Sequence, residues 1–130
     1  MKRLAILGAS GHGKVVADIA LAAGWTQVVF FDDAWPQRQR NGRWDIAGNF
    51  AALIGALDGL DGVVVAIGDN ATRWDKHRQL SAAGARMATL THPAASVSPF
   101  ARVGLGSVLM AGAVVNADAE LGEASIVNTG

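Results

Sequence analysis

The chain has 130 residues, 51% of them apolar, which is enough for the core of one ordinary domain or of a small domain with part of another. Its 11 basic and 11 acidic side chains balance, which argues against recognition of nucleic acid or of a membrane by bulk charge, and no apolar run approaches the roughly 20 residues of a membrane span. The absence of cysteine excludes disulfides and thiolate metal sites, and we expect a soluble cytoplasmic protein.

The first part of the chain predicts alternating strands and helices. Residues 4–7 and 28–31 are short apolar runs that stop at glycine or aspartate, as buried parallel strands do. Between them, residues 12–23 carry apolar side chains at helical spacing and are followed by glycine. The polar segment 34–44, with proline, asparagine and glycine, is predicted as a loop, and residues 49–57 as a short helix.

The same alternation continues to about residue 90. Residues 63–67 form a third apolar run, 70–83 carry a second long helical pattern, and 87–90 are predicted as a fourth, shorter strand. Strands that alternate with helices imply a parallel sheet covered on both faces. We therefore expect an α/β fold whose first domain is a small Rossmann-like sheet over residues 1–93.

From about residue 94, helical periodicity gives way to a period of six. Branched aliphatic residues recur without a gap, at Val97, Val103, Leu109, Val115, Leu121 and Val127. A small residue stands two positions before each of them, at Ala95, Ala101, Ser107, Ala113, Ala119 and Ser125. The residues just after the aliphatics are expected to form tight corners with positive φ, at Gly104, Asn116, Gly122 and Asn128. A linker rich in Ala, Val and Gly would not keep this phase, so the pattern predicts a β-solenoid over residues 94–130.

A glycine-rich loop, Gly8-Ala9-Ser10-Gly11-His12-Gly13, joins the first strand to the first helix. The first N–H groups of a helix lack intrahelical partners and lie at its positive end, where a phosphate accepts several hydrogen bonds. The three glycines allow a ligand to approach the backbone, Ser10 offers a hydroxyl, His12 an imidazole and Lys14 a charge. The spacing is not the usual Gly-x-Gly-x-x-Gly, so the interpretation depends on the strand before the loop and the helix after it.

Two further features point to the same edge of the sheet. The pair Asp32-Asp33 ends the second strand, where carboxylates commonly accept hydrogen bonds from ribose hydroxyls. Gly68 ends the third strand, and the carboxyl ends of parallel strands are where such sheets bind ligands. The alternative is that the glycines only permit tight turns and the aspartates only cap a loop.

The remaining candidates favour structural roles. His77 lies in a charged stretch and is expected on a solvated helix face, and His92-Pro93 is expected to form a turn. No group of histidine and carboxylate residues has the spacing of metal ligands, so no metal is expected.

A nucleotide-binding βα unit followed by hexapeptide repeats resembles the sugar acyltransferases of the sialic acid O-acetyltransferase type. Among them it is most similar to the bacterial enzymes that acetylate a UDP-linked 4-amino sugar for bacillosamine-type or pilin glycosylation. The matching stretches are Ile6-Leu7-Gly8-Ala9-Ser10-Gly11-His12-Gly13-Lys14-Val15-Val16, Phe31-Asp32-Asp33, Val65-Ala66-Ile67-Gly68-Asp69-Asn70, His92-Pro93 and Ile126-Val127-Asn128-Thr129.

The resemblance implies that the first domain binds a UDP-linked amino sugar. On the family pattern the binding residues are Ser10, Gly11 and His12 on the diphosphate and sugar side, Asp32 and Asp33 at the uridine, and Gly68 in the same cleft, with Gly8 and Gly13 completing the loop. The resemblance also implies an acetyl-CoA-dependent N-acetyltransferase, a left-handed parallel β-helix that begins in residues 94–130, and a homotrimer.

In these enzymes a histidine on the β-helix, paired with an acidic neighbour, is the general base for attack of the sugar amine on acetyl-CoA. It follows the Asn-Thr segment, here Asn128-Thr129, by a few residues. We therefore expect this histidine and most of the acetyl-CoA site to lie beyond Gly130 in a longer acetyltransferase, and this chain to bind substrate without transferring acetyl.

Two hypotheses from other classes stay open. The chain could be a non-catalytic sensor of nucleotide sugars that uses the solenoid as an interaction surface. It could also be an NAD-dependent oxidoreductase, although about four strands before the solenoid are too few for the two halves of a dinucleotide-binding sheet.

Overall fold

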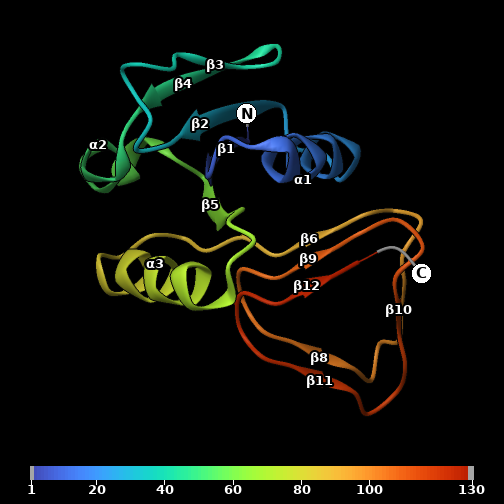
Figure 1. Cartoon of the computed structure of the whole chain (residues 1–130). Coiled ribbons are helices and arrows are strands. Elements are labelled where there is room, and N and C mark those ends of the chain that lie inside the picture. Colours follow the sequence, from blue (N-terminus) through green and yellow to red (C-terminus); the bar gives the residue numbers. More distant parts are fainter. Residues whose placement is uncertain (1, 129–130) are drawn as a thin grey trace.

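The computed structural model describes residues 2–128 and contains a five-stranded sheet followed by a parallel β-helix (Figure 1). The strands of the sheet lie in the order β3-β4-β2-β1-β5. Their bounds are β1 Arg3–Leu7, β2 Gln27–Phe31, β3 Arg40–Asn41, β4 Trp44–Gly48 and β5 Gly62–Val65. All neighbours pair in parallel except β3 and β4, which confirms the predicted α/β fold.

Each α-helix begins at a polar side chain that caps it. The helices are α1 Gly11–Ala22, α2 Phe50–Gly55 and α3 Asn70–Ala82, with a short 3-10 helix, η1, at Leu57–Gly59. The side chains of Ser10, Asn49 and Asp69 each accept a backbone N–H of the following first turn, a donor that has no partner inside the helix. The three predicted helices are confirmed with small shifts of their ends, and no helix within residues 2–128 is long and apolar enough to cross a membrane.

Alternation along the strands builds two hydrophobic cores, one on each face of the sheet. In β1, Leu4 and Ile6 belong to the core that α1 covers, whereas Ala5 and Leu7 belong to the core that α2 and α3 cover. The core on the α1 face also takes in three residues that follow α3, namely Leu90, Val108 and Met110. The β-helix is therefore packed onto the first domain through a shared core.

The prediction of a loop over residues 34–44 is wrong in part. β3 and β4 form an antiparallel hairpin in which Arg40 pairs with Asp45 and Asn41 with Trp44. β4 then pairs in parallel with β2 through Ile46. Because β3 is a two-residue strand at the edge of the sheet, its side chains are mostly polar and give no apolar run to detect.

The predicted strand at residues 87–90 is also wrong. Met87 makes only an isolated parallel bridge to Val63. Leu90 instead begins β6 (Leu90–Thr91), which pairs with β9 (Val108–Leu109) of the β-helix. The β3–β4 hairpin supplies two of the five strands of the sheet, beside β2. The domain boundary after residue 93 stays a prediction.

The period of six in the sequence is the period of the β-helix strands. The other strands are β7 Ser96–Val97, β8 Arg102–Val103, β10 Val114–Val115, β11 Glu120–Leu121 and β12 Ile126–Val127. They stack in parallel as β7 on β10, β8 on β11, and β6, β9 and β12 together. Each strand therefore lies over the third strand after it along the chain, so three hexapeptides complete one coil, as the stacked strands in Figure 1 show.

The left-handed corners of the β-helix lie two residues later than predicted. Positive φ occurs at Gly106, Gly112, Asp118 and Ala124, not at Gly104, Asn116, Gly122 or Asn128. The residue just after each aliphatic still belongs to the strand ladder: the N–H of Gly104, for example, donates to the carbonyl of Leu121 at 2.9 Å. The chain turns only after that bond is made.

Candidate functional site

The carboxyl ends of β1 and β5 lie side by side at the point where the strand order of the sheet reverses. β2 and β4 lie on one side of β1, and β5 lies on the other. Ligands of open α/β sheets bind at such a switch point, between the loops that diverge from the two strands. The loop after β1 is the glycine loop, and the loop after β5 contains Gly68, so the structure brings these two predicted segments together.

Two glycines of the loop are required by the fold. Gly8 has a φ of +115°, and a Cβ there would lie 2.6 Å from the carbonyl oxygen of Ala66. A Cβ on Gly13 would lie 2.3 Å from the carbonyl oxygen of Gly8 and 2.9 Å from Cε1 of Phe30. The positive φ and the approach of the loop after β5 account for Gly8, and the packing of α1 against the end of β1 and against β2 accounts for Gly13. The alternative of purely conformational glycines therefore fits these two positions.

Gly11 and Gly68 differ, because a Cβ at either position would meet open space. Gly11 is the first residue of α1, and neither its N–H nor that of His12 has an acceptor within residues 2–128. These two donors lie at the positive end of a 12-residue helix. Packing gives no reason for glycine here, whereas an anion bound to the two N–H groups does.

Two residues outside the predicted site hold the glycine loop in place. Arg38 donates from Nη1 to the carbonyl of Ala9 and from Nη2 to Oδ1 of Asn41, the latter at 2.9 Å. Asn41 is fully buried and donates from Nδ2 to the carbonyl of Ser10 at 3.2 Å. The hydroxyl of Ser10 accepts the N–H of Gly13 at 3.4 Å, so it caps α1.

The two aspartates at the end of β2 do different work. Asp32 accepts the N–H of Ala9 at 2.7 Å on Oδ2 and the N–H of Ala34 at 2.8 Å on Oδ1. Its carboxylate is therefore already committed to shaping the loops. Asp33 is exposed and accepts the N–H of Phe50 at 3.0 Å on Oδ1. Its Oδ2 takes no part in that hydrogen bond.

A small pocket of about 170 Å³ lies beside these carboxylates. It is lined by Leu7, Gly8, Asp32, Asp33, Phe50, Ile67, Thr72 and Lys76. Nζ of Lys76 lies 4.2 Å from the centroid of the Phe50 ring, so α3 and α2 meet at its wall. Apolar side chains beside carboxylates suit the base and ribose of a nucleoside.

A second pocket of about 300 Å³ lies between the start of α1 and the β-helix. It is lined by His12, Gly68, Asn70, Arg73, Ile126 and Asn128. Nε2 of His12 is buried and has no hydrogen-bond partner within the described residues. Burial lowers the pKa of His12, and the charge of Arg73 lowers it further, so the imidazole is neutral at pH 7.

The prediction that His77 lies on a solvated helix face is wrong. Its side chain is 2% exposed, and its Nε2 lies 3.0 Å from Oε1 of Glu123. The ring packs against the corner at Gly106, where a Cβ would lie 2.5 Å from Cε1 of the imidazole. The charged stretch around His77 gave no sign that this helix would be covered by the β-helix.

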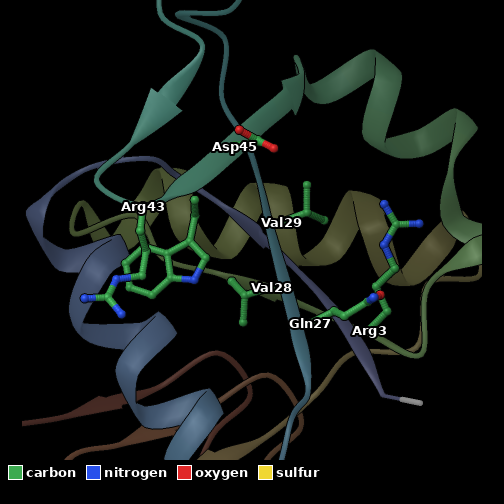
Figure 2. A pocket seen from close by; sticks show the side chains of 7 residues that line it. Arg3, Gln27, Val28, Val29, Arg43 and Asp45 are labelled. Atoms are coloured by element: carbon green, nitrogen blue, oxygen red, sulfur yellow. The ribbon is translucent and has the colours of Figure 1, made fainter.

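A further pocket lies at the opposite edge of the sheet and is not assigned to the candidate site. It measures about 500 Å³ and is lined by Arg3, Gln27, Val28, Val29, Arg43, Trp44 and Asp45, at the amino ends of β1, β2 and β4. Figure 2 shows the Arg43 side chain beside an aromatic ring, and its guanidinium carbon lies 5.7 Å from the centroid of Trp44. Within residues 2–128 no three His, Cys, Asp or Glu side chains gather as a metal site would require.

The structure thus brings the predicted site residues to one edge of the sheet. Two pockets lie at this edge: Gly8, Asp32 and Asp33 line the smaller one, of about 170 Å³, and His12 and Gly68 line the larger one, of about 300 Å³. Ser10, Gly11 and Gly13 form the turn into α1. The predicted turn at His92 is also confirmed, since its Nδ1 accepts the N–H of Ala94 at 2.9 Å.

The family profile described as the PglD N-terminal domain matches residues 3–80. This stretch includes all five strands of the sheet and more than half of the chain. The chain belongs to the PglD N-terminal domain family. The resemblance to sugar acetyltransferases that the glycine loop and the repeats indicated is therefore confirmed.

Relatives of this PglD N-terminal domain chain match it through the β-helix as well. UDP-N-acetylbacillosamine N-acetyltransferase from Bacillus subtilis (strain 168) is 35% identical over 114 residues, which cover 85% of this chain and 52% of that protein. The acetyltransferase domain of PglB from Neisseria gonorrhoeae FA1090, solved with acetyl coenzyme A, has a TM-score of 0.90 and 38% identity over 98% of this chain and 62% of its own. PerB from Caulobacter crescentus, solved with CoA and GDP-perosamine, has a TM-score of 0.91 and 34% identity over 100% of this chain and 61% of its own. The chain thus spans about half the length of the curated relative and about three fifths of the solved ones.

Proposed function

We propose that this chain binds the nucleotide-sugar acceptor of an acetyl-CoA-dependent sugar N-acetyltransferase, and that the acceptor is a UDP-linked amino sugar acetylated on its 4-amino group. The observation that carries the proposal is the pair of N–H donors at Gly11 and His12, which have no acceptor within residues 2–128. Packing does not require a glycine at Gly11. A diphosphate at these donors would extend its nucleoside toward Asp33 and its sugar toward His12.

In the proposed reaction the sugar amine attacks the thioester carbonyl of acetyl-CoA. An amide bond forms, the bond from the carbonyl carbon to sulfur breaks, and a general base takes the amine proton as CoA leaves. We assign residues 2–128 the acceptor side of this reaction and give none of them the role of that base. His12 is neutral at pH 7, and its place at the start of α1 beside the larger pocket favours contact with the diphosphate or the sugar.

For the whole protein we propose a homotrimer assembled through the β-helix. The support is a set of large apolar side chains that the β-helix leaves exposed, namely Phe100, Leu105 and Val114. Exposed apolar side chains on one solenoid are an expected feature of a surface that another copy covers.

A GDP-linked sugar is the second candidate, because PerB was solved with GDP-perosamine. The pocket beside Asp33 holds about 170 Å³, which favours the smaller base, uracil. Titration calorimetry of the chain with UDP, GDP and NAD shows which of these nucleotides it binds. We expect UDP to bind more tightly than GDP and NAD not to bind. A chain that binds GDP in preference to UDP would change the sugar-nucleotide class, and one that binds NAD but neither diphosphate would contradict the proposal.

A further inference from the structure

Arg73 is a buried cation whose position the proposed function does not explain. Its side chain is 9% exposed. Nη1 donates to the carbonyls of Ile67 at 3.0 Å and Gly68 at 3.1 Å, and Nη2 donates to Oδ1 of Asn70 at 2.7 Å. No carboxylate is among these acceptors, so the guanidinium is hydrogen-bonded to neutral oxygens. A buried charge is costly unless it is paired and hydrogen-bonded, so the position of Arg73 calls for an explanation.

The fourth hydrogen bond of Arg73 reaches the β-helix. Nε donates to the carbonyl of Ala124, 51 residues further along the chain, at 2.7 Å. Ala124 is a buried corner residue with a φ of +57°, a conformation that costs a residue with a Cβ roughly 1–2 kcal/mol. Its own N–H donates to the carbonyl of Leu105 at 3.0 Å, which fixes the corner in place. One guanidinium thus joins the loop after β5, the start of α3 and the second coil of the β-helix.

These contacts place Arg73 in the wall of the larger pocket, beside His12. Among the six residues that line this pocket, Arg73 is the one with a permanent charge, and the others are His12, Gly68, Asn70, Ile126 and Asn128. The carboxylate of Asp69, next to Gly68 in the chain, accepts both the hydroxyl of Thr72 at 2.7 Å and its N–H at 2.9 Å. These hydrogen bonds lower the pKa of Asp69, and the charge of Arg73 helps to lower it. Asp69 does not line the pocket, so Arg73 is the charged group that the pocket presents to a ligand.

We propose that Arg73 is the positioning residue of the sugar-side pocket: it holds the Gly68 loop and the Ala124 corner at a fixed separation and supplies the positive charge that the sugar diphosphate meets there. This inference rests on the proposed function, because it needs the diphosphate at the start of α1. It predicts that Arg73 matters for a ligand that fills both pockets and little for one that fills only the pocket beside Asp33.

The lowered pKa of His12 is a consequence of the same arrangement. Burial is the larger cause and the charge of Arg73 the second. Lys14 follows His12 by two residues on the same helix, and Asp69 caps the start of α3, but neither lines the pocket. Removing the charge of Arg73 should raise the pKa of His12, which a residue that serves packing alone would not do.

The test is calorimetry with UMP and with UDP-N-acetylglucosamine on four chains: wild type, Arg73→Gln, Arg73→Lys and the control Arg78→Gln. Arg78 is exposed on the same helix, where its Nη2 lies 3.2 Å from Oδ1 of Asp75. We expect Arg73→Gln to weaken UDP-N-acetylglucosamine about tenfold or more, the loss of a charge-assisted contact, and UMP by less than about threefold. Arg73→Lys keeps a charge but cannot reach all four acceptors at once, so it should restore only part of the affinity. NMR titration should show a raised His12 pKa in Arg73→Gln and a low one in Arg73→Lys.

Three results would overturn the proposal. Equal loss of both ligands in Arg73→Gln would give Arg73 a purely structural role, and so would an unchanged pKa of His12. If Arg73→Gln does not fold, Arg73→Lys carries the test, and a lysine variant that binds both ligands like the wild type would overturn the need for the guanidinium. A wild-type chain that binds neither ligand would overturn the proposed function, whereas one that binds both while Arg73→Gln loses both equally would overturn this inference alone.

Discussion

Asp32 and Ala9, 23 residues apart in the chain, are joined by a 2.7 Å hydrogen bond from the Ala9 N–H to Oδ2 of Asp32. The bond ties the end of β2 to the glycine loop that follows β1. The other oxygen of the same carboxylate accepts the N–H of Ala34 at 2.8 Å. An aspartate expected to meet the ribose therefore shapes the loop that is expected to meet the phosphates, and Asp33 is left as the carboxylate open to a ligand.

We expect Asp32→Asn to lower the free energy of unfolding by about 1–3 kcal/mol, because an amide has one acceptor oxygen and leaves a backbone N–H of Ala9 or Ala34 unpaired. Urea unfolding followed by circular dichroism measures this. Asp18→Asn, at an exposed position of α1, is the matched control and should change stability by less than about 0.5 kcal/mol. An Asp32→Asn chain as stable as the control would show that the carboxylate is not a support of the loop.

The glycines of the loop should separate into two classes under substitution by alanine. Gly13→Ala places a Cβ 2.3 Å from the carbonyl oxygen of Gly8, so we expect a loss of stability of about 1–3 kcal/mol or more. Gly11→Ala meets no atom within 4 Å and should leave thermal stability unchanged or slightly higher. Thermal unfolding of the two variants side by side checks this, and similar losses in both would contradict the division.

The fold could be predicted from the sequence more fully than the contacts that hold the glycine loop in place. The short apolar runs and the period of six identify the parallel sheet, α1, α3 and the stacked strands, because both patterns follow directly from burial. The supports of the loop are different. Arg38 and Asn41 belong to a polar segment, and a buried polar residue such as Asn41 leaves no periodic signal. Their role depends on where β3 and β4 fold back, which the chain order alone does not give.

The contact between α3 and the β-helix gives a third prediction. Gly106→Ala adds a Cβ 2.5 Å from the buried ring of His77 at a φ of +79°, so we expect a loss of roughly 2–4 kcal/mol. Gly122→Ala, at a β-helix position with open space around its Cβ, is the control and should be nearly neutral. In a His77→Ala background the cost of Gly106→Ala should shrink, and strict additivity in this double-mutant cycle would argue against the contact.

The same contact explains why His77 could not be placed from the sequence. A helix whose exposed face and covered face are both polar shows no amphipathic pattern, and α3 uses Arg73 and His77 to face the corners of the β-helix. The corners themselves were also misplaced, since Asp118 and Ala124 are not glycine and their conformation is set by stacking on the previous coil. Both features arise from contacts between segments about 45 or more residues apart or between successive coils.

The pKa of His12 predicts a pH dependence of stability. Because the folded state lowers this pKa below the ordinary value of 6.5, the unfolded chain binds the proton more readily. The contribution of neutral His12 is therefore complete above pH 6.5 and is lost as the pH falls through the folded-state pKa. Thermal midpoints measured from pH 8 to pH 5 should fall more steeply in the wild type than in His12→Asn. Parallel curves for the two chains would mean that His12 titrates as it does in the unfolded chain.

The most direct test of the central claim is calorimetric titration of UDP into the wild type and into Gly11→Val. In the unliganded protein the added side chain has open space to enter, but it would occupy the place where the phosphate reaches the N–H groups of Gly11 and His12. We predict that Gly11→Val unfolds within a few degrees of the wild type and binds UDP at least about tenfold more weakly, the loss of more than one hydrogen bond to a charged group. Unchanged UDP affinity in a folded Gly11→Val chain, or no UDP binding by the wild type, would contradict the account.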